Sequence, residues 1–139
     1  MGKTGVGAGT ATVLVIDDDT DFTTAVRAVL EGEGYQVVTA ASGREGLRQL
    51  RERPPDLIIL DVMMESVTEG YGVNEAIKHS GEYEQFQQTP ILMVSSVQQS
   101  PDELYPRAPE TDMIRPDRYL TKPLDIPVFL EVVRRALGR

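Results

Sequence analysis

Apolar residues occur along the chain in two patterns, continuous runs and helical repeats. Continuous runs at residues 12–16, 57–60 and 90–94 are typical of strands that are buried on both faces. Shorter runs at residues 35–39 and 119–121 predict two further strands. The chain is therefore expected to contain five short, buried strands.

Several of the remaining segments carry apolar residues at the three- and four-residue spacing of an amphipathic helix. The predicted apolar faces consist of Phe22, Ala25, Val26 and Val29; of Leu47 and Leu50; of Val73, Ala76 and Ile77; and of Ile126, Phe129, Leu130, Val133, Ala136 and Leu137. Asp19 or Thr20 is expected to cap the first of these helices. Ser42 and Glu45 have the form of a capping box at the start of the second.

Strands and helices thus alternate along the chain, which predicts an α/β fold. We expect a doubly wound, five-stranded parallel sheet with helices on both faces. The segment 97–118 contains Pro101, Pro106, Pro109 and Pro116, so we expect a short or irregular fourth helix there. Residues 12–138 form the predicted single domain, and residues 1–11 a flexible, glycine-rich tail.

Composition narrows the functional classes. The 139 residues carry a formal net charge of -8, which argues against a general nucleic-acid binder because phosphate backbones attract basic faces. The absence of cysteine excludes disulfides and thiolate metal sites. No apolar run approaches the roughly 20 residues of a membrane span, and no signal peptide is visible, so a cytoplasmic protein is expected.

Polar residues stand where the predicted strands end. Asp17 and Asp18 follow the first strand, Asp61 the third, Ser95 the fourth and Lys122 the fifth. The carboxyl ends of parallel strands share one edge of the sheet, and ligands bind there in open α/β folds. Each residue alone has an ordinary explanation as a cap, turn residue or solvated charge, but their coincidence at one edge favours a functional site.

Three carboxylates at one edge repel one another, and a divalent cation would relieve that repulsion. Mg²⁺ prefers oxygen ligands, so it suits this set of residues. A carboxylate can also attack phosphorus, and a metal, an ammonium and a hydroxyl can then each meet a phosphoryl oxygen. Asp19, the third consecutive acid, is interpreted as the helix cap rather than as a ligand.

The stretches VLVIDDD, PDLIILDVMM, TPILMVSS and YLTKPL together resemble the receiver domain of two-component response regulators, of the CheY-like superfamily. The resemblance extends over nearly the whole chain and implies a receiver fold. It implies that Asp61 accepts a phosphoryl group. It also implies that Mg²⁺ is held by Asp18 directly, by Asp17 partly through water, by Asp61, and by the backbone carbonyl of Met63.

The same resemblance implies a conformational switch. Ser95 is the expected switch hydroxyl that turns towards the phosphoryl group, and Lys122 the lysine that pairs with that group. Tyr119 is the expected aromatic switch residue, whose ring moves inward when Ser95 moves. The peptide bond between Lys122 and Pro123 is expected to be cis, a state open to X-Pro bonds.

The chain departs from the family pattern around these residues. Glu65 stands four residues after Asp61, where proline is common, and the loop before Gly70 is longer than usual. The interval from Ser95 to Tyr119 is also longer, which leaves open whether the protein is a monomer or a phosphorylation-dependent dimer.

Met63 and Val97 stand two residues after Asp61 and Ser95. In this family these positions flank the water that hydrolyses the aspartyl phosphate. Both side chains are apolar, so neither can orient a water molecule by hydrogen bonding. We therefore expect the phosphoryl group to persist.

The implied role is signalling rather than enzymatic turnover, apart from Mg²⁺-dependent autophosphorylation from small donors and slow autodephosphorylation. The expected partner is a sensor histidine kinase or a histidine phosphotransfer protein. A downstream protein target is unknown, and no direct contact with nucleic acid or membrane is expected. One alternative is a receiver-fold interaction module that is not phosphorylated.

A second alternative is a phosphatase of haloacid-dehalogenase type, with Asp17 as the nucleophile and Asp19 as the general acid/base. Such enzymes need a further acidic pair after the lysine, but only Asp125 and one helix follow Lys122. Asp61 would also have no role.

Overall fold

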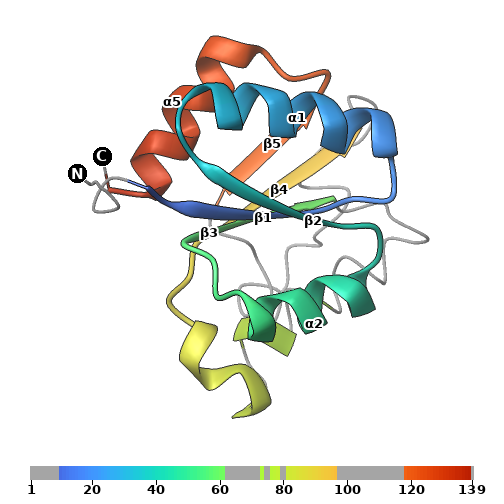
Figure 1. Ribbon diagram of the computed structural model, residues 1–139, viewed down its shortest axis with the longest axis vertical. Helices are drawn as coiled ribbons and strands as arrows, with labels where there is room; N and C mark the ends of the chain where they lie inside the picture. Colours follow the sequence, from blue (N-terminus) through green and yellow to red (C-terminus); the bar gives the residue numbers. More distant parts are fainter. Residues whose placement is uncertain (1–9, 62–72, 74–75, 79–80, 97–117, 139) are drawn as a thin grey trace, which may run out of the picture.

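A parallel sheet of five strands forms the centre of the structure (Figure 1). The structure, a computed structural model, describes residues 10–61, 73, 76–78, 81–96 and 118–138. The strands are β1 (Thr12–Ile16), β2 (Gln36–Ala40), β3 (Leu57–Asp61), β4 (Ile91–Ser96) and β5 (Arg118–Lys122). They lie in the order β2-β1-β3-β4-β5, and every neighbouring pair is parallel. The predicted five-stranded parallel sheet is confirmed.

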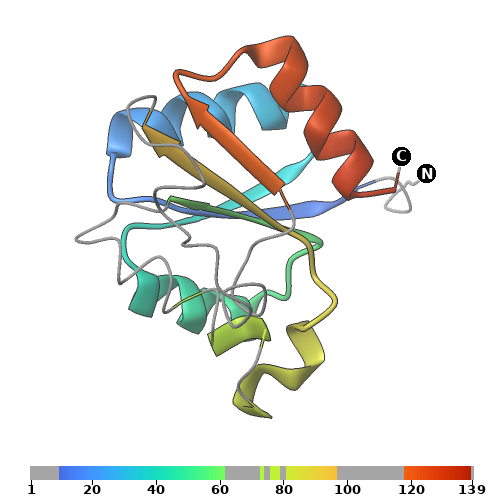
Figure 2. The ribbon, with the colours of Figure 1, turned by 180° about the vertical axis from the view of Figure 1, so that it is seen from behind.

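Helices lie on both faces of this sheet, as a doubly wound fold requires. The helices α1 (Thr20–Gly32) and α5 (Ile126–Ala136) lie on one face, and α2 (Gly43–Glu52) lies on the other (Figures 1 and 2). A short 3₁₀ helix, η1 (Gly81–Phe86), which the sequence did not predict, precedes β4 on the α2 side. Residues 73 and 76–78 are helical where a third helix was predicted. The predicted irregular fourth helix lies outside the described residues.

Two apolar clusters form the core, one on each face of the sheet. On β1, Val13 and Val15 belong to the cluster under α1 and α5, and Leu14 and Ile16 to the cluster over α2. All four are buried, which explains why β1 reads as a continuous apolar run. Ala11, assigned to the tail by sequence, is also buried and accepts a hydrogen bond from the Gln36 N–H, so the packed chain begins earlier than predicted.

The helix α2 approaches β1 closely at Gly46. A Cβ atom at this position would lie 2.8 Å from Cγ1 of Ile16 and closer still to its Cδ1. Glycine inside a helix costs about 0.5–1 kcal/mol relative to alanine. The cost is accepted here because no side chain fits between the helix and the strand.

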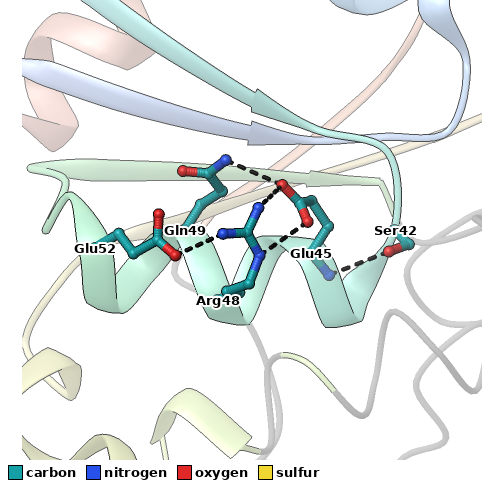
Figure 3. Close-up of polar contacts among 5 residues, drawn as sticks. All are labelled: Ser42, Glu45, Arg48, Gln49 and Glu52. Atoms are coloured by element: carbon teal, nitrogen blue, oxygen red, sulfur yellow. Dashed lines mark hydrogen bonds and ion pairs between the residues drawn. The ribbon is translucent and has the colours of Figure 1, made fainter.

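Side-chain caps start the helices as the sequence indicated, with one correction. The Ser42 Oγ accepts a hydrogen bond from the Glu45 N–H at 3.1 Å. Within the described part of the chain, the Glu45 carboxylate returns no bond to Ser42 and accepts from Arg48 and Gln49 (Figure 3). Only half of the predicted capping box forms. Hydrogen bonds from Arg48 and then Gln49 hold the pKa of Glu45 below its ordinary value of 4.5.

The strand β2 begins one residue later than predicted, because the end of α1 takes up Tyr35. Gly34 has a φ of 93°, a left-handed conformation that favours glycine. The Tyr35 N–H then donates to the Leu30 carbonyl at 3.1 Å, inside the last turn of the helix. Tyr35 therefore closes the helix instead of starting the strand.

Candidate functional site

The carboxyl end of β1 places two acids at the edge of the sheet. The Asp17 N–H donates to the Ala40 carbonyl at 3.0 Å and so extends the pairing of β1 with β2. The Asp17 side chain is buried, and its Oδ1 accepts from the Asp19 N–H at 2.9 Å. Asp18 is exposed. The chain turns away from the sheet here with one carboxylate held inside and the next facing solvent.

Asp61 joins these two acids from the neighbouring strand. It is the last residue of β3, opposite Val94 of β4, and its side chain is only 6% exposed. One oxygen each from Asp17, Asp18 and Asp61 can be chosen so that all three lie within 4.8 Å of one another. The predicted acidic cluster is thus present, at the carboxyl ends of two strands that are hydrogen-bonded to each other.

Lys122, the last residue of β5, brings a positive charge to the cluster. Its Nζ lies 3.0 Å from Asp17 Oδ2, 3.8 Å from Asp61 Oδ1 and 4.3 Å from the centroid of the Phe22 ring. Asp17 Oδ2 is buried and accepts no hydrogen bond from the described residues, so its contact with Lys122 is an ion pair without a directed hydrogen bond. The peptide bond from Lys122 to Pro123 is cis.

The cluster fits a hard divalent cation. Three carboxylates and one ammonium leave two negative charges uncompensated in a partly buried place. Asp17 Oδ2 is a buried acceptor without a hydrogen-bond donor among the described residues. All of the candidate ligand atoms are carboxylate oxygens, the type that Mg²⁺ and Ca²⁺ prefer. A metal at this point would offset the repulsion among the three carboxylates that the sequence predicts.

The predicted switch residues are described in part. Ser95 lies inside β4, opposite Thr121 of β5, and is fully buried. The backbone of Tyr119 pairs with Met93, while the position of its ring lies outside what the structure describes. Met63 and Val97 also lie outside the described residues.

Asp19 acts as the N-cap of α1, as predicted. Its Oδ1 accepts from the Phe22 N–H at 3.1 Å. This engagement disfavours the phosphatase alternative, in which Asp19 would be the general acid/base. The contact between Lys122 and Phe22 was not anticipated, because the spacing of Phe22 indicated a core position and nothing local points to Lys122.

Comparison with known families decides the fold family. Residues 13–134 match the model of the response regulator receiver domain. The chain belongs to this family. Receiver domains act in two-component signal transduction. Membership of this family implies a phosphoryl-accepting aspartate.

Relatives of this receiver domain include regulators of different lengths. It is 33% identical over 132 residues to the transcriptional regulatory protein AfsQ1 of Streptomyces coelicolor, with 91% of this chain and 51% of that protein covered. The chain thus spans about half the length of AfsQ1. It is 28% identical over 132 residues to the polar-differentiation response regulator DivK of Brucella ovis, with 93% of this chain and 98% of that protein covered.

Solved structures show the same fold for this receiver domain. The chemotaxis protein CheY4 of Vibrio cholerae superimposes with a TM-score of 0.75 at 32% identity, covering 91% of this chain and 98% of that one. The receiver domain of NtrX from Brucella abortus gives a TM-score of 0.74 at 25% identity, with the same coverage of 91% and 98%. Among the described residues, no helix is long and apolar enough to cross a membrane.

Proposed function

We propose that this receiver domain accepts a phosphoryl group on Asp61 with Mg²⁺ bound. The observation that carries the proposal is the position of Asp61, a buried carboxylate beside two other acids and 3.8 Å from the Lys122 ammonium. Asp17, Asp18, Asp61 and the backbone carbonyl of Met63 would hold the metal. Mg²⁺ would supply charge stabilisation at the phosphoryl oxygens.

The transfer itself is a substitution at phosphorus. One Asp61 oxygen forms a bond to phosphorus while the bond from phosphorus to the donor nitrogen breaks, and that nitrogen takes up a proton. Negative charge on the phosphoryl oxygens then lies next to Lys122. The ammonium is already near Asp61, so it needs little rearrangement to pair with the new group.

Phosphorylation then biases a conformational switch. Ser95, buried in β4, turns its hydroxyl towards the phosphoryl group, and Tyr119 on the neighbouring β5 moves its ring inward. The parallel pairing of β4 with β5 supports this coupling, because the two residues lie on adjacent strands. A local change in charge thus reshapes the face near β5 and α5.

A histidine kinase or a histidine phosphotransfer protein in the cytoplasm is the proposed donor. DivK, with which the chain aligns over nearly its full length, is a response regulator, and AfsQ1 is a transcriptional regulatory protein of about twice the aligned length. The proposed signal passes to a downstream protein target. The protein acts in this proposal either as a monomer or as a dimer that forms on phosphorylation.

Intact mass after incubation with Mg²⁺ and phosphoramidate tests the proposal. We expect the native protein to gain one phosphoryl group, and both Asp61→Asn and EDTA-treated protein to gain none. Asp21→Asn is the matched control, since Asp21 is an exposed acid in the first turn of α1, outside the cluster, and should leave the adduct unchanged. If native protein binds Mg²⁺ but forms no adduct, the domain is an unphosphorylated interaction module.

A further inference from the structure

The contact between Phe22 of α1 and Lys122 is the feature of the site that neither the sequence pattern nor the acid cluster explains. The centroid of the Phe22 ring lies 4.3 Å from the Lys122 Nζ, inside the distance of a cation–π interaction. The lysine side chain is 23% exposed, so the ammonium is partly withdrawn from water. The ring therefore contacts a cation where such contacts are stronger than at an open surface.

The lysine needs this kind of restraint. Lys122 ends β5, an edge strand separated from β1 by β4 and β3. Its ammonium is nonetheless 3.0 Å from Asp17, which directly follows β1, so a flexible four-carbon stem reaches across the edge of the sheet. Side chains of this type lose up to about 2 kcal/mol of rotamer entropy when they are fixed. A contact between the ammonium and the Phe22 ring limits the range of positions that the ammonium takes relative to Asp61.

Phe22 is itself held in place by the acidic loop. The ring packs against the apolar cluster under α1 and α5. The Phe22 N–H donates to the Asp19 side chain, and the Asp19 N–H donates to the Asp17 side chain. Asp17 pairs in turn with Lys122, so a closed circuit of four residues ties the ring and the ammonium to the same loop.

We propose that Phe22 is a positioning residue for Lys122 in phosphoryl transfer. This inference rests on the proposed function and adds a residue that holds the Lys122 ammonium near Asp61. An aromatic face attracts the ammonium without competing as strongly as a third carboxylate would for its N–H donors. The donors stay available to a phosphoryl oxygen, and the ring keeps water from one side of the cation, which strengthens its electrostatic effect.

A double-mutant cycle tests this role through the rate of adduct formation from phosphoramidate. Phe22→Leu keeps an apolar side chain but removes the ring, and should slow phosphorylation roughly tenfold, within the range of a partly desolvated cation–π contact. Phe22→Tyr keeps the ring and should restore the rate to within about twofold. In a Lys122→Met background, Phe22→Leu should have no further effect, because the ring acts through the ammonium.

Val29→Ala controls for a loss of packing, since Val29 is also half-buried on α1 against the same cluster. It should lower the midpoint of thermal unfolding and leave the phosphorylation rate unchanged. An equal slowing by Phe22→Leu with and without Lys122 would make Phe22 a structural residue and overturn the inference.

Proton NMR gives a readout that needs no phosphorylation. In the native protein the ring current of Phe22 should shift the Lys122 Hε resonances upfield, and Phe22→Leu should abolish that shift. Absence of the shift in native protein would overturn the inference. If the upfield shift is present but the protein gains no phosphoryl group, the contact exists and the proposed function is wrong. The proposed role of Phe22 in phosphoryl transfer would then be wrong as well.

Discussion

Replacing Asp18 by asparagine should stabilise the protein in the absence of metal. Asp18 is exposed, so the substitution leaves the core intact and removes one charge from the acidic cluster. The two remaining carboxylates, Asp17 and Asp61, both lie beside Lys122. The variant therefore isolates the repulsion between Asp18 and its two acidic neighbours.

The structure sets the size of the effect. Two unit charges 4.8 Å apart repel by about 0.9 kcal/mol in bulk water and by about 3.5 kcal/mol at an effective dielectric constant of 20. Asp18 faces solvent, so the lower value applies to each of its two repulsions, and the lost attraction to Lys122 offsets part of the gain. We expect Asp18→Asn to raise the free energy of unfolding by about 1 kcal/mol. That corresponds to a rise of roughly 3 to 4 °C in the unfolding midpoint.

Thermal unfolding followed by far-ultraviolet circular dichroism measures this change, since the chain contains no tryptophan. The native protein in EDTA is compared with Asp18→Asn and with Asp21→Asn. Asp21 lies in the first turn of α1, where a negative charge favours the helix, so its removal should destabilise slightly. Saturating Mg²⁺ should stabilise the native protein, by about 2.7 kcal/mol at a hundredfold excess over Kd, and stabilise Asp18→Asn much less.

Two results would refute the electrostatic reasoning. One is a loss of stability in Asp18→Asn in EDTA, of the same sign as in Asp21→Asn. The other is a gain that does not shrink as salt is raised from 0.1 M to 1 M, because the Debye length falls from about 10 Å to about 3 Å, shorter than the 4.8 Å between these charges.

Three further predictions concern packing, pH and the lifetime of the phosphoryl group. Gly46→Ala should destabilise the protein by about 1–2 kcal/mol, since overpacking against β1 outweighs the gain in helix propensity. Gly32→Ala should be neutral or slightly stabilising, because a Cβ atom at this position meets nothing within 4 Å. Urea denaturation measures the stability of both variants. Glu45→Gln should lower stability at pH 7, because the Arg48 contact favours the ionised form of Glu45 in the folded protein. The difference in stability from the native protein should vanish as pH falls below 4.5 and through the folded-state pKa of Glu45. Urea midpoints from pH 3 to pH 7 measure this, and a difference that persists at pH 3 would contradict it. Met63→Asn should shorten the life of the aspartyl phosphate by offering a hydrogen bond to the hydrolytic water, which intact mass after donor removal follows; an unchanged lifetime would count against the role assigned to Met63.

The fold could be predicted from sequence because its main signals are local. Strands buried on both faces read as uninterrupted apolar runs, and β1 has the predicted bounds. The one-residue error at β2 arose because Gly34 and the Leu30 carbonyl draw Tyr35 into the end of α1. The 3₁₀ helix η1 carries no clear periodic signal and was missed.

The acidic part of the site could also be predicted, since the carboxyl ends of parallel strands must meet at one edge. Asp17, Asp18 and Asp61 come together as expected, and Lys122 reaches them. The place of Phe22 could not be inferred, because its contact with Lys122 joins α1 to the opposite end of the chain. The failed half of the capping box has a similar cause, since Arg48 competes for the Glu45 carboxylate.

Asp17, Asp61 and Lys122 lie at the carboxyl ends of three strands that are far apart in the sequence, and the lysine ends the last of them. During synthesis, the acids would emerge from the ribosome well before their cation. A chain interrupted before β5 would carry the three acids without the ammonium beside them. The charge balance of the cluster is therefore complete only once the last strand has joined the sheet.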